Sequence, residues 1–309
     1  MLRCYSHERK SGLIKTTKSS LCLFVITQFS IALKPCKTQN AAFPLLDPSN
    51  CEKTSNMQMK NDPILTLIPA RMQATRLPGK PMLEIAGQPM IVHVWERATR
   101  AQLGPVCVAT DSPDIAACIQ AEGGQAILTD ADLPSGSDRI YQALQKSAVF
   151  AQTEHVINLQ GDLPELDPAL LHKLAEVLRE DRWDLTTLAA PMDNSQAQKS
   201  QIVKAVASFP DGIEKTGRAL YFSRAAVPHG SAVFYHHIGL YGWRVAALKK
   251  FVSLPPSPME LSEKLEQLRA LEAGMTIGIG VVDHAPGGVD TQEDLDEVRA
   301  RFSSTISAR

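Results

Sequence analysis

Three features are scarce in this sequence: long apolar runs, an excess of one charge, and cysteines beyond the first 51 residues. No apolar run reaches the ~18 residues that a membrane-spanning helix needs. The 32 basic and 33 acidic residues give a net charge of −1, which is not typical of a nucleic-acid or membrane surface. Only Cys107 and Cys118 lie beyond residue 51, and we expect buried free thiols in a reducing cytoplasm, with no disulfide framework. These absences predict a cytoplasmic protein that binds neither nucleic acid nor membranes.

Residues 1–60 differ in composition from the rest of the chain. Glu8 is the one acid among residues 1–46, and the apolar run Leu21–Leu33 is interrupted by polar residues. The run has the length of a secretory signal core, yet no A-x-A-like cleavage site follows it promptly. We interpret residues 1–60 as a dispensable extension that arises from an upstream start codon, with Met57 or Met59 as the working start. An organelle-targeting peptide is the alternative.

From Ile64 onward, strand-like and helix-like segments alternate. The strand-like segments are Ile64–Ile68, Val106–Ala109, Val156–Leu159, Leu185–Ala190, Ile202–Ala207 and Thr276–Val282. The helix-like segments are Met90–Gln102, one that opens at Pro113, one capped by Asp167 and Pro168, and Pro258–Gly274, where Leu261, Leu265 and Leu268 share a face. This alternation predicts an α/β fold with a mostly parallel sheet and flanking helices. Ligands of such sheets bind beyond the carboxyl ends of the strands.

A basic loop follows the first strand-like segment. Residues 68–81 read IPARMQATRLPGKP and bring Arg71, Arg76 and Lys80 into one loop. Arg presents a planar fork and Lys a compact point charge, while Gly79 permits a positive φ. Such a loop can surround a polyphosphate and neutralise the charge that develops as a phosphoryl bond breaks. The alternative interpretation is a solvated basic turn.

Two acids occupy predicted turns at the same edge of the sheet. Asp162 follows the segment Val156–Leu159 in LQGDLP, and Asp290 lies in GVDTQEDL, before a helix that Thr291 caps with Asp294 three residues on. Carboxylates together with substrate phosphates are the usual ligands of Mg²⁺, and two such acids facing a basic loop suit a metal-bridged nucleotidyl transfer. Otherwise, Asp162 would only stabilise a turn and Asp290 a helix N-terminus.

The wider segment 68–97 resembles the N-terminal signature of the sugar-activating cytidylyltransferases. The similarity continues in ordered blocks to about residue 300, namely CVATD, SGSDR, LQGDLP, ALYFSRA, HHIGLYGWR, LEQLR and GVDTQEDL. The sequence is most similar to the 3-deoxy-manno-octulosonate cytidylyltransferase (CMP-Kdo synthetase) family. The resemblance implies a nucleotide-diphospho-sugar-transferase-like domain over residues 61–309, with an inserted dimerisation element, acting as a homodimer. The implied reaction transfers CMP from CTP to 3-deoxy-D-manno-octulosonate (Kdo) for lipopolysaccharide biosynthesis, with Mg²⁺ as cofactor.

The resemblance also implies roles for individual residues. The catalytic residues would be Arg71, Arg76, Lys80 and Asp162, and the Mg²⁺ ligands would be Asp162 and Asp290. The cytidine side of the pocket would be formed by Ala109, Asp111, Ser135, Gly136, Arg139 and Gln160. The sugar acid would be bound by Arg224, His237, Tyr241, Glu266 and Gln267.

Structural alternatives exist for several of these positions. Ser135 could cap a helix that starts near Ser137, and Arg139 could form a surface ion pair. His237 could be structural. Glu266 and Gln267 lie off the apolar stripe of their predicted helix, so solvent exposure is the alternative for both.

The sequence departs from the family at a few positions. Leu163 stands where the family commonly has Glu, Ala74 where it has Ser, and the chain between Pro228 and Phe234 is shorter and lacks basic residues. These departures affect the choice of sugar acid, so an amino-substituted Kdo or a sialic-acid-like sugar is an alternative. A catalytically silent nucleotide-sugar binding module is the alternative from a different functional class.

Overall fold

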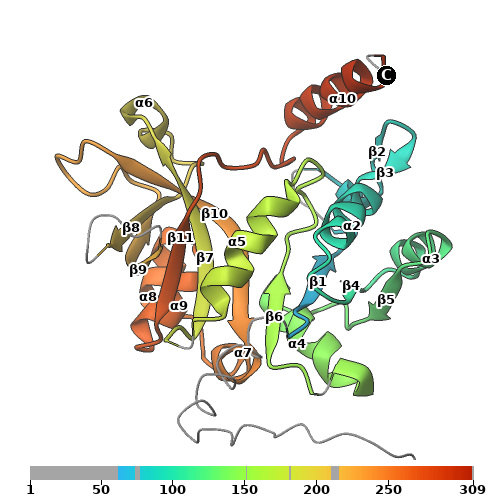
Figure 1. Cartoon of the computed structure of the whole chain (residues 1–309), viewed down its shortest axis with the longest axis horizontal. Helices are drawn as coiled ribbons and strands as arrows, with labels where there is room; N and C mark the ends of the chain where they lie inside the picture. The colour runs from blue at the N-terminus through green and yellow to red at the C-terminus, as the bar shows by residue number, and fades with distance from the viewer. Residues whose placement is uncertain (1–61, 74–76, 151, 181, 210–215, 308–309) are drawn as a thin grey trace, which may run out of the picture. The chain divides into compact units, whose positions relative to one another are not determined.

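The computed structural model describes residues 62–73, 77–150, 152–180, 182–209 and 216–307 (Figure 1). The predicted extension 1–60, with its start at Met57 or Met59, lies outside these residues, and so does Arg76. Within the described ranges, no helix is both long and apolar enough to cross a bilayer.

The described part of the chain contains a nine-stranded sheet, a two-stranded ribbon and flanking helices (Figure 1). The strands of the large sheet are β1 (Leu65–Ala70), β4 (Val106–Thr110), β5 (Gln125–Leu128), β6 (His155–Asn158), β7 (Leu185–Met192), β8 (Lys204–Ser208), β9 (Thr216–Ser223), β10 (Phe234–Arg244) and β11 (Ile277–Val281). The ribbon consists of β2 (Glu84–Ile85) and β3 (Gln88–Pro89). The helices are α2 (Met90–Arg100), α3 (Pro113–Ala121), α4 (Gly136–Lys146), α5 (Pro168–Leu178), α6 (Asn194–Ala197), α7 (Val245–Val252), α8 (Pro258–Glu263), α9 (Gln267–Glu272) and α10 (Gln292–Ser307), with short 3-10 turns η2 (Lys80–Met82) and η3 (Ala148–Phe150).

The large sheet combines a parallel half with a mixed half. Its strand order is β5-β4-β1-β6-β10-β7-β11-β9-β8. β1 pairs in parallel with β4 and β6, β4 with β5, and β7 with β11, whereas β8, β9 and β10 pair antiparallel with their neighbours. The α/β class with flanking helices is confirmed. The prediction of a mostly parallel sheet is wrong for the second half, because β10, which the strand prediction omitted, runs antiparallel between β6 and β7.

The mixed half closes on itself. β8 pairs with β9 through Lys204 and Ser223, and it also pairs with β10 through Lys204 and His236. The strands β10, β7, β11, β9 and β8 therefore form a closed circuit of pairings. This closure fixes the end of β9, and with it the start of the loop that follows Ser223, beside the first residues of β10.

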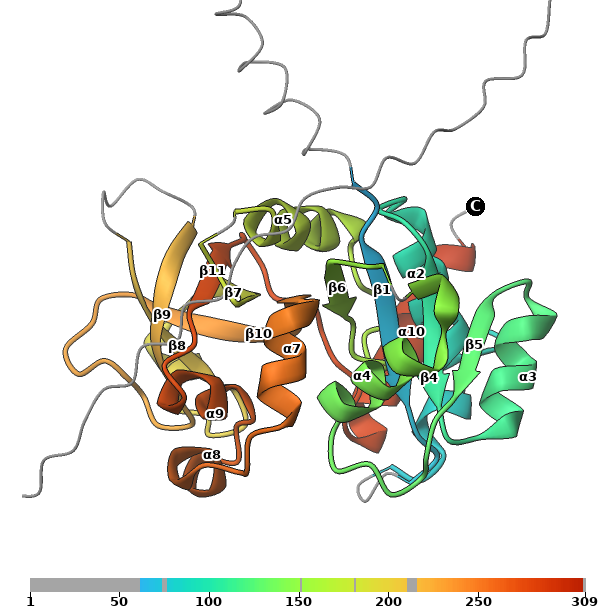
Figure 2. The same ribbon diagram turned by 90° about the horizontal axis from the view of Figure 1, so that it is seen from below.

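Helices pack on both faces of the large sheet, with α5 on one side and α7 and α9 on the other (Figure 2). One apolar core contains residues of α2, α3 and α5, including Val92, Ile119 and Leu174. The second contains residues of α4, α7 and α9, including Ile140 and Leu268. Burial of each such side chain stabilises the fold by about 1.5–3 kcal/mol. The two cores therefore hold the helices against the sheet and fix the positions of the strand ends.

Helix α5 forms where its sequence predicts. Asp167 accepts a hydrogen bond from the Ala169 amide at 2.9 Å, and Pro168 occupies the first turn. The helix buries an apolar stripe that consists of Leu170, Leu171, Leu174, Val177 and Leu178. A capped helix with one apolar face needs no other local signal.

The predicted helix Pro258–Gly274 is wrong as a single element. The structure divides it into α8 and α9, because Lys264 takes a left-handed conformation with φ 56° and ψ 48°. This break resets the helical phase, so Leu261 is 65% exposed although Leu265 and Leu268 are buried. The same reset turns Gln267 into the core, with 4% exposure, and the alternative of an exposed Gln267 is also wrong.

Candidate active site

Lys80 joins the two predicted metal ligands. Its ammonium donates to Asp162 Oδ2 at 2.8 Å and to Asp290 Oδ1 at 3.1 Å, although these residues come from three separate segments of the chain. Gly79, with φ 68°, turns the chain into η2, whose first residue is Lys80. The Lys80 side chain is 16% exposed. The structure therefore brings together the basic loop and both acids, as the sequence predicts.

The backbone around the two acids fixes their positions. The Val289 amide donates to the Asp162 carbonyl at 3.0 Å, which ties the two loops together. Asp294 accepts from the amides of Asp290 and Thr291 at 2.9 and 2.8 Å, while Thr291 Oγ1 accepts from the Asp294 amide. The predicted cap of α10 by Thr291 and Asp294 is confirmed. Asp294 therefore satisfies these two amides, while the Asp290 carboxylate contacts Lys80.

Two neighbouring cavities lie along the carboxyl end of β1. A cavity of about 320 Å³ is lined by Arg71, Lys80, Asp162 and Asp290, among others. A cavity of about 170 Å³ is lined by Arg71 and by the predicted cytidine-side residues Ser135, Gly136, Arg139 and Gln160. The two cavities share Pro69, Ala70, Arg71 and Gln160. They are therefore adjoining parts of one cleft, with Arg71 at their boundary.

The residues of this cleft fit a divalent cation that also binds phosphate. The described residues contain no group of three or more His, Cys, Asp or Glu side chains that could hold a metal ion by themselves. Asp162 and Asp290 nevertheless converge on one cation, the Lys80 ammonium. Mg²⁺ commonly takes one or two carboxylates and completes its coordination with water and substrate phosphates, so two oxygen donors at the mouth of a cleft suit it.

Arg139 is the central cation of the predicted cytidine side. It is 3% exposed, so the alternative of a surface ion pair is wrong. Its guanidinium donates to Thr129 Oγ1 at 2.5 Å and to the Asp130 carbonyl at 3.2 Å, and lies 3.6 Å from Asp111 Oδ2. Burial lowers the pKa of Arg139, whereas Asp111 favours its charged form. Asp111 Oδ1 is buried without a hydrogen-bond partner, so the pair retains acceptor capacity.

The remaining cytidine-side residues surround the end of β1. Ala109 pairs with Pro69 in the sheet and is fully buried, so its side chain cannot face a ligand in the cleft. A Cβ on Gly136 would lie 3.3 Å from Pro69 Cγ, so glycine permits the close approach of α4 to β1. Ser135 is the N-cap of α4, as the alternative for this residue predicts, and its hydroxyl accepts from the Asp138 amide at 3.3 Å. It also makes a second contact, with Glu266.

Four of the five predicted sugar-acid residues form one polar group, in which His237 and Gln267 are buried and Tyr241 and Glu266 are partly buried. Tyr241 donates to Gln267 Oε1 at 3.2 Å, and its ring lies 5.6 Å from that of His237. Glu266 adjoins Gln267 and contacts Ser135 Oγ at 2.6 Å, so the sugar-acid residues reach the cytidine side. Burial strongly raises the pKa of Tyr241 and also raises that of Glu266.

His237 is neutral in this group. Burial, with a smaller contribution from neighbouring His236, lowers its pKa to about 3. Thr187 Oγ1 donates to the Ile238 carbonyl at 2.9 Å and lies 3.0 Å from His237 Nε2. The hydroxyl proton of Thr187 is therefore used, so Nε2 carries the proton and donates to Thr187.

Arg224 forms its hydrogen bonds with residues outside this group of four. Its Nε donates to the Glu263 carbonyl at 2.9 Å and its guanidinium to the Ser200 carbonyl at 3.3 Å. Its amide donates to Glu263 Oε2 at 2.9 Å. The Arg224 carbonyl accepts from Lys204, a fully buried lysine that also donates to the carbonyls of Lys199 and Ile202.

Sequence reasoning missed several residues that shape the site. Lys204 has a weak signal, since a single lysine interrupts an apolar strand. Glu263 and Ser137 have none, because their partners lie far away in the chain. Asp138 has a local one, since its partner Ser135 is the N-cap three residues earlier. Leu163, where the resembling family commonly has Glu, is 8% exposed and packs in an apolar core.

Comparison with known proteins is consistent with this geometry. A family profile described as cytidylyltransferase matches residues 65–277. A 3-deoxy-manno-octulosonate cytidylyltransferase of Rhodopseudomonas palustris (strain ATCC BAA-98 / CGA009) is 54% identical over 242 residues, which cover 78% of this chain and 98% of the relative. One of the same name from Parvibaculum lavamentivorans is 53% identical, covering 77% of this chain and 92% of the relative.

A solved structure is also similar. It is described as CMP:2-keto-3-deoxy-manno-octonic acid synthetase complexed with CTP, and it is 37% identical with a TM-score of 0.73. The match covers 79% of this chain and 100% of that chain.

Proposed function

This chain belongs to the 3-deoxy-manno-octulosonate cytidylyltransferase family, and from that membership we propose that it transfers CMP from CTP to Kdo. The products are CMP-Kdo, for lipopolysaccharide biosynthesis, and pyrophosphate. The observation that carries the proposal is the contact of Lys80 with both Asp162 and Asp290 at the mouth of a cleft that continues to Ser135 and Arg139. This cleft offers cations and carboxylates at one end and polar base-recognition groups at the other.

The phosphate side, which we define as Arg71, Lys80, Asp162 and Asp290, holds the triphosphate of CTP. Arg71 is exposed at the boundary of the two cavities, where a forked cation can bind two phosphate oxygens. Lys80 moves from the carboxylates to the phosphates when CTP enters. Its charge then stabilises the oxygens around the bond that breaks. Arg76 belongs to the same loop and has the same proposed role.

Asp162 and Asp290 would hold Mg²⁺ together with the phosphates. When bound there, Mg²⁺ stabilises negative charge at the α-phosphate and orients the pyrophosphate leaving group. The carboxylates themselves are positioned by the amide contact of Val289 and by the capped start of α10.

The cytidine and sugar-acid sides bind the two organic groups. Asp111, Ser135, Gly136, Arg139 and Gln160 line the cavity or lie beside it, and buried polar groups of this kind penalise a wrong base because they would remain unpaired. The sugar-acid side, which we define as Arg224, His237, Tyr241, Glu266 and Gln267, recognises the carboxylate and hydroxyls of Kdo. Arg224 suits the carboxylate, and Glu266 suits a hydroxyl.

We further propose a cytoplasmic homodimer whose dimerisation element is inserted in the second half of the chain. Cys107 and Cys118 are free thiols; Cys107 is buried, as predicted, whereas Cys118 is only partly buried. Burial raises the pKa of Cys107 to about 12. Unreactive free thiols are consistent with a reducing compartment. Light scattering of the purified protein tests the homodimer.

The reaction is tested by pyrophosphate release. Each of the four ribonucleoside triphosphates is combined with Kdo, an amino-substituted Kdo or sialic acid, in the presence of Mg²⁺ or of EDTA. We expect release with CTP and Kdo, and loss of release with EDTA. Release with a different sugar acid would transfer the proposal to that acid, whereas CTP binding without any release would favour a silent nucleotide-sugar binding module.

A further inference from the structure

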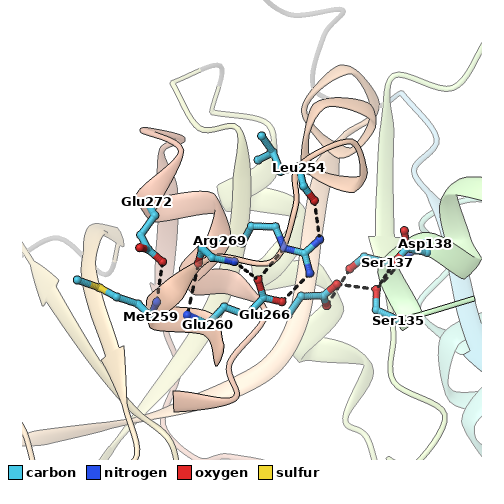
Figure 3. Close-up of polar contacts among 10 residues, drawn as sticks. Ser135, Ser137, Asp138, Leu254, Met259, Glu260, Glu266, Arg269 and Glu272 are labelled. Atoms are coloured by element: carbon cyan, nitrogen blue, oxygen red, sulfur yellow. Dashed lines mark hydrogen bonds and ion pairs between the residues drawn. The ribbon is translucent and has the colours of Figure 1, made fainter. Parts of the chain in front are cut away.

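Ser135, Asp138 and Glu266 form a chain of short oxygen contacts (Figure 3). Ser135 Oγ lies 2.6 Å from Glu266 Oε1 and 2.7 Å from Asp138 Oδ2. The same oxygen accepts from the Asp138 amide at 3.3 Å, and Ser137 Oγ donates to Glu266 Oε2 at 3.1 Å. Ser135 is on the proposed cytidine side and Glu266 on the sugar-acid side, so this chain joins the two substrate pockets.

The contacts require one proton more than the hydroxyl supplies. A serine hydroxyl has one proton to donate and two lone pairs that accept. If both carboxylates were ionised, the proton of Ser135 could serve only one of them, and the other pair of oxygens would repel at less than 2.8 Å. One carboxyl must therefore be protonated and donate to Ser135 Oγ. The hydroxyl then uses its proton and both lone pairs.

Glu266 is the carboxyl that carries this proton. Asp138 lies in the first turn of α4, where the helix N-terminus favours a negative charge. Glu266 is the N-cap residue of α9 and contacts Ser135 and Ser137 at the start of α4; burial raises its pKa, as does the charge of Asp138. Arg269 and the two serine hydroxyls oppose this effect.

The other charged groups around Glu266 do not supply a full counter-charge. Arg269 is committed to Glu260, with contacts of 2.8 and 2.5 Å (Figure 3). Its guanidinium also lies 4.7 Å from the centre of the Phe251 ring. Tyr241, which faces Glu266 from β10 through Gln267, is uncharged, since burial strongly raises its pKa. Asp138 is therefore the charge that most directly opposes ionisation of Glu266.

We propose that Asp138 is a positioning residue that shares one extra proton with Glu266 through Ser135, and thereby sets the charge that Glu266 presents to the sugar acid. This inference rests on the proposed role of Glu266 in binding Kdo. When the sugar acid binds, one of its hydroxyls donates to Glu266, and the carboxyl proton leaves to solvent. The use of Kdo should therefore increase as pH rises through the titration of Glu266, whereas the use of CTP should follow this titration less.

The first experiment measures the shared proton without any substrate. Thermal midpoints are recorded between pH 4.5 and 9 for wild type, Glu266→Gln, Asp138→Asn and the double variant. A carboxyl with a raised pKa in the folded state binds its proton more tightly there, so wild type should lose stability relative to Glu266→Gln as pH rises. In the Asp138→Asn background this loss should shrink. A wild-type difference that is constant with pH, or a loss of equal size in both backgrounds, would overturn the proposal.

The second experiment measures the consequence for catalysis. The acid limb of kcat/KM for Kdo should shift to lower pH in Asp138→Asn, because the negative charge of Asp138 no longer opposes ionisation of Glu266. Asp114→Asn, which removes a carboxylate from the first turn of α3, is the matched control and should leave the limb in place. An unshifted limb in Asp138→Asn contradicts the positioning role.

A third variant keeps the proposal testable if Asp138→Asn folds poorly. Asp138→Ser removes the same negative charge with a shorter side chain and should also reduce the pH-dependent difference from Glu266→Gln, and an undiminished difference would count against the proposal. The two proposals fail in different ways. If wild type releases no pyrophosphate with any sugar acid, the proposed function is wrong, while the thermal measurements still decide whether the proton is shared.

Discussion

The phosphate side and the sugar-acid side of the cleft differ in the exposure of their side chains and in the elements that carry them. On the phosphate side, Asp162 and Asp290 have side chains that are 30% and 49% exposed, and they meet through Lys80 at the edge of a cavity. On the sugar-acid side, His237 and Gln267 are 7% and 4% exposed and belong to the packing between sheet and helices. One side depends on charge at loop ends, and the other on polar groups embedded in a core.

Because of this difference, we expect mutations on the phosphate side to change activity with little effect on stability. A partly exposed ion pair contributes little to folding, about 0–1 kcal/mol, so the phosphate side can be changed without unfolding the protein. A buried polar group that loses its partner costs about 1–3 kcal/mol, so changes on the sugar-acid side should affect affinity and stability together. The predictions below test this division.

The largest expected effect is removal of either proposed metal ligand. Asp162→Asn or Asp290→Asn should lower kcat about a hundredfold or more, because one neutral amide cannot replace an anionic ligand facing the phosphates. The thermal midpoint should stay within a few degrees of wild type. Pyrophosphate release at saturating Mg²⁺ and a thermal melt measure the two quantities. Asp283→Asn, an exposed carboxylate in the same β11–α10 connection, is the control with normal turnover, and near-normal turnover in either ligand variant would refute the metal assignment.

Replacement of Lys80 should have the next largest effect. Lys80→Ala should reduce kcat and the use of CTP by tenfold to about a hundredfold, since its charge is most effective as the α–β phosphate bond opens. It also leaves Asp162 and Asp290 without their shared cation. Mg²⁺ should therefore raise the thermal midpoint of Lys80→Ala more than that of wild type. Equal Mg²⁺ effects on both proteins would show that the two carboxylates do not share the ion.

Arg224→Ala tests the opposite side. A hydrogen bond to a charged group is worth about 1.5–3 kcal/mol, so the KM for Kdo should rise about tenfold while that for CTP changes little. Arg224→Lys should recover only part of the loss, because a point charge cannot make the forked contact. Steady-state kinetics with each substrate varied in turn measures both constants. If CTP weakens and Kdo does not, the sugar acid has been assigned to the wrong side of the cleft.

The sequence predicts the phosphate side more completely than the sugar-acid side. Lys80, Asp162 and Asp290 each follow a recognisable signal: a glycine that turns the loop, a strand end, or a helix cap. Strand ends of a parallel half-sheet meet at one edge, so local signals are enough to bring these residues together. The burial of Glu266 has no local signal, because Ser135 lies 131 residues away in the chain.

The errors in the fold have the same origin. The left-handed Lys264 breaks the predicted helix Pro258–Gly274 without the glycine that usually marks such a position. Strand β10 contains glycines, histidines and a shift of register between Ile238 and Tyr241, so it lacks the regular alternation by which strands are recognised. Tertiary pairing with β6 and β7 determines both its existence and its direction.

The smallest expected effect is at His237, and it sharpens the contrast within the sugar-acid side. His237 is neutral because burial lowers its pKa to about 3, so His237→Gln should reduce kcat/KM for Kdo only severalfold and should not move its acid limb. Its effect on stability has the opposite sign to that of Glu266. Below pH 6.5 the histidine binds a proton in the unfolded state but stays neutral in the folded state. Wild type should therefore lose stability relative to His237→Gln as pH falls from about 6.5. Thermal melts at a series of pH values measure this slope. A wild-type protein that instead gains stability over His237→Gln as pH falls would mean that His237 is charged in the fold, and the neutral state assigned to it would be wrong.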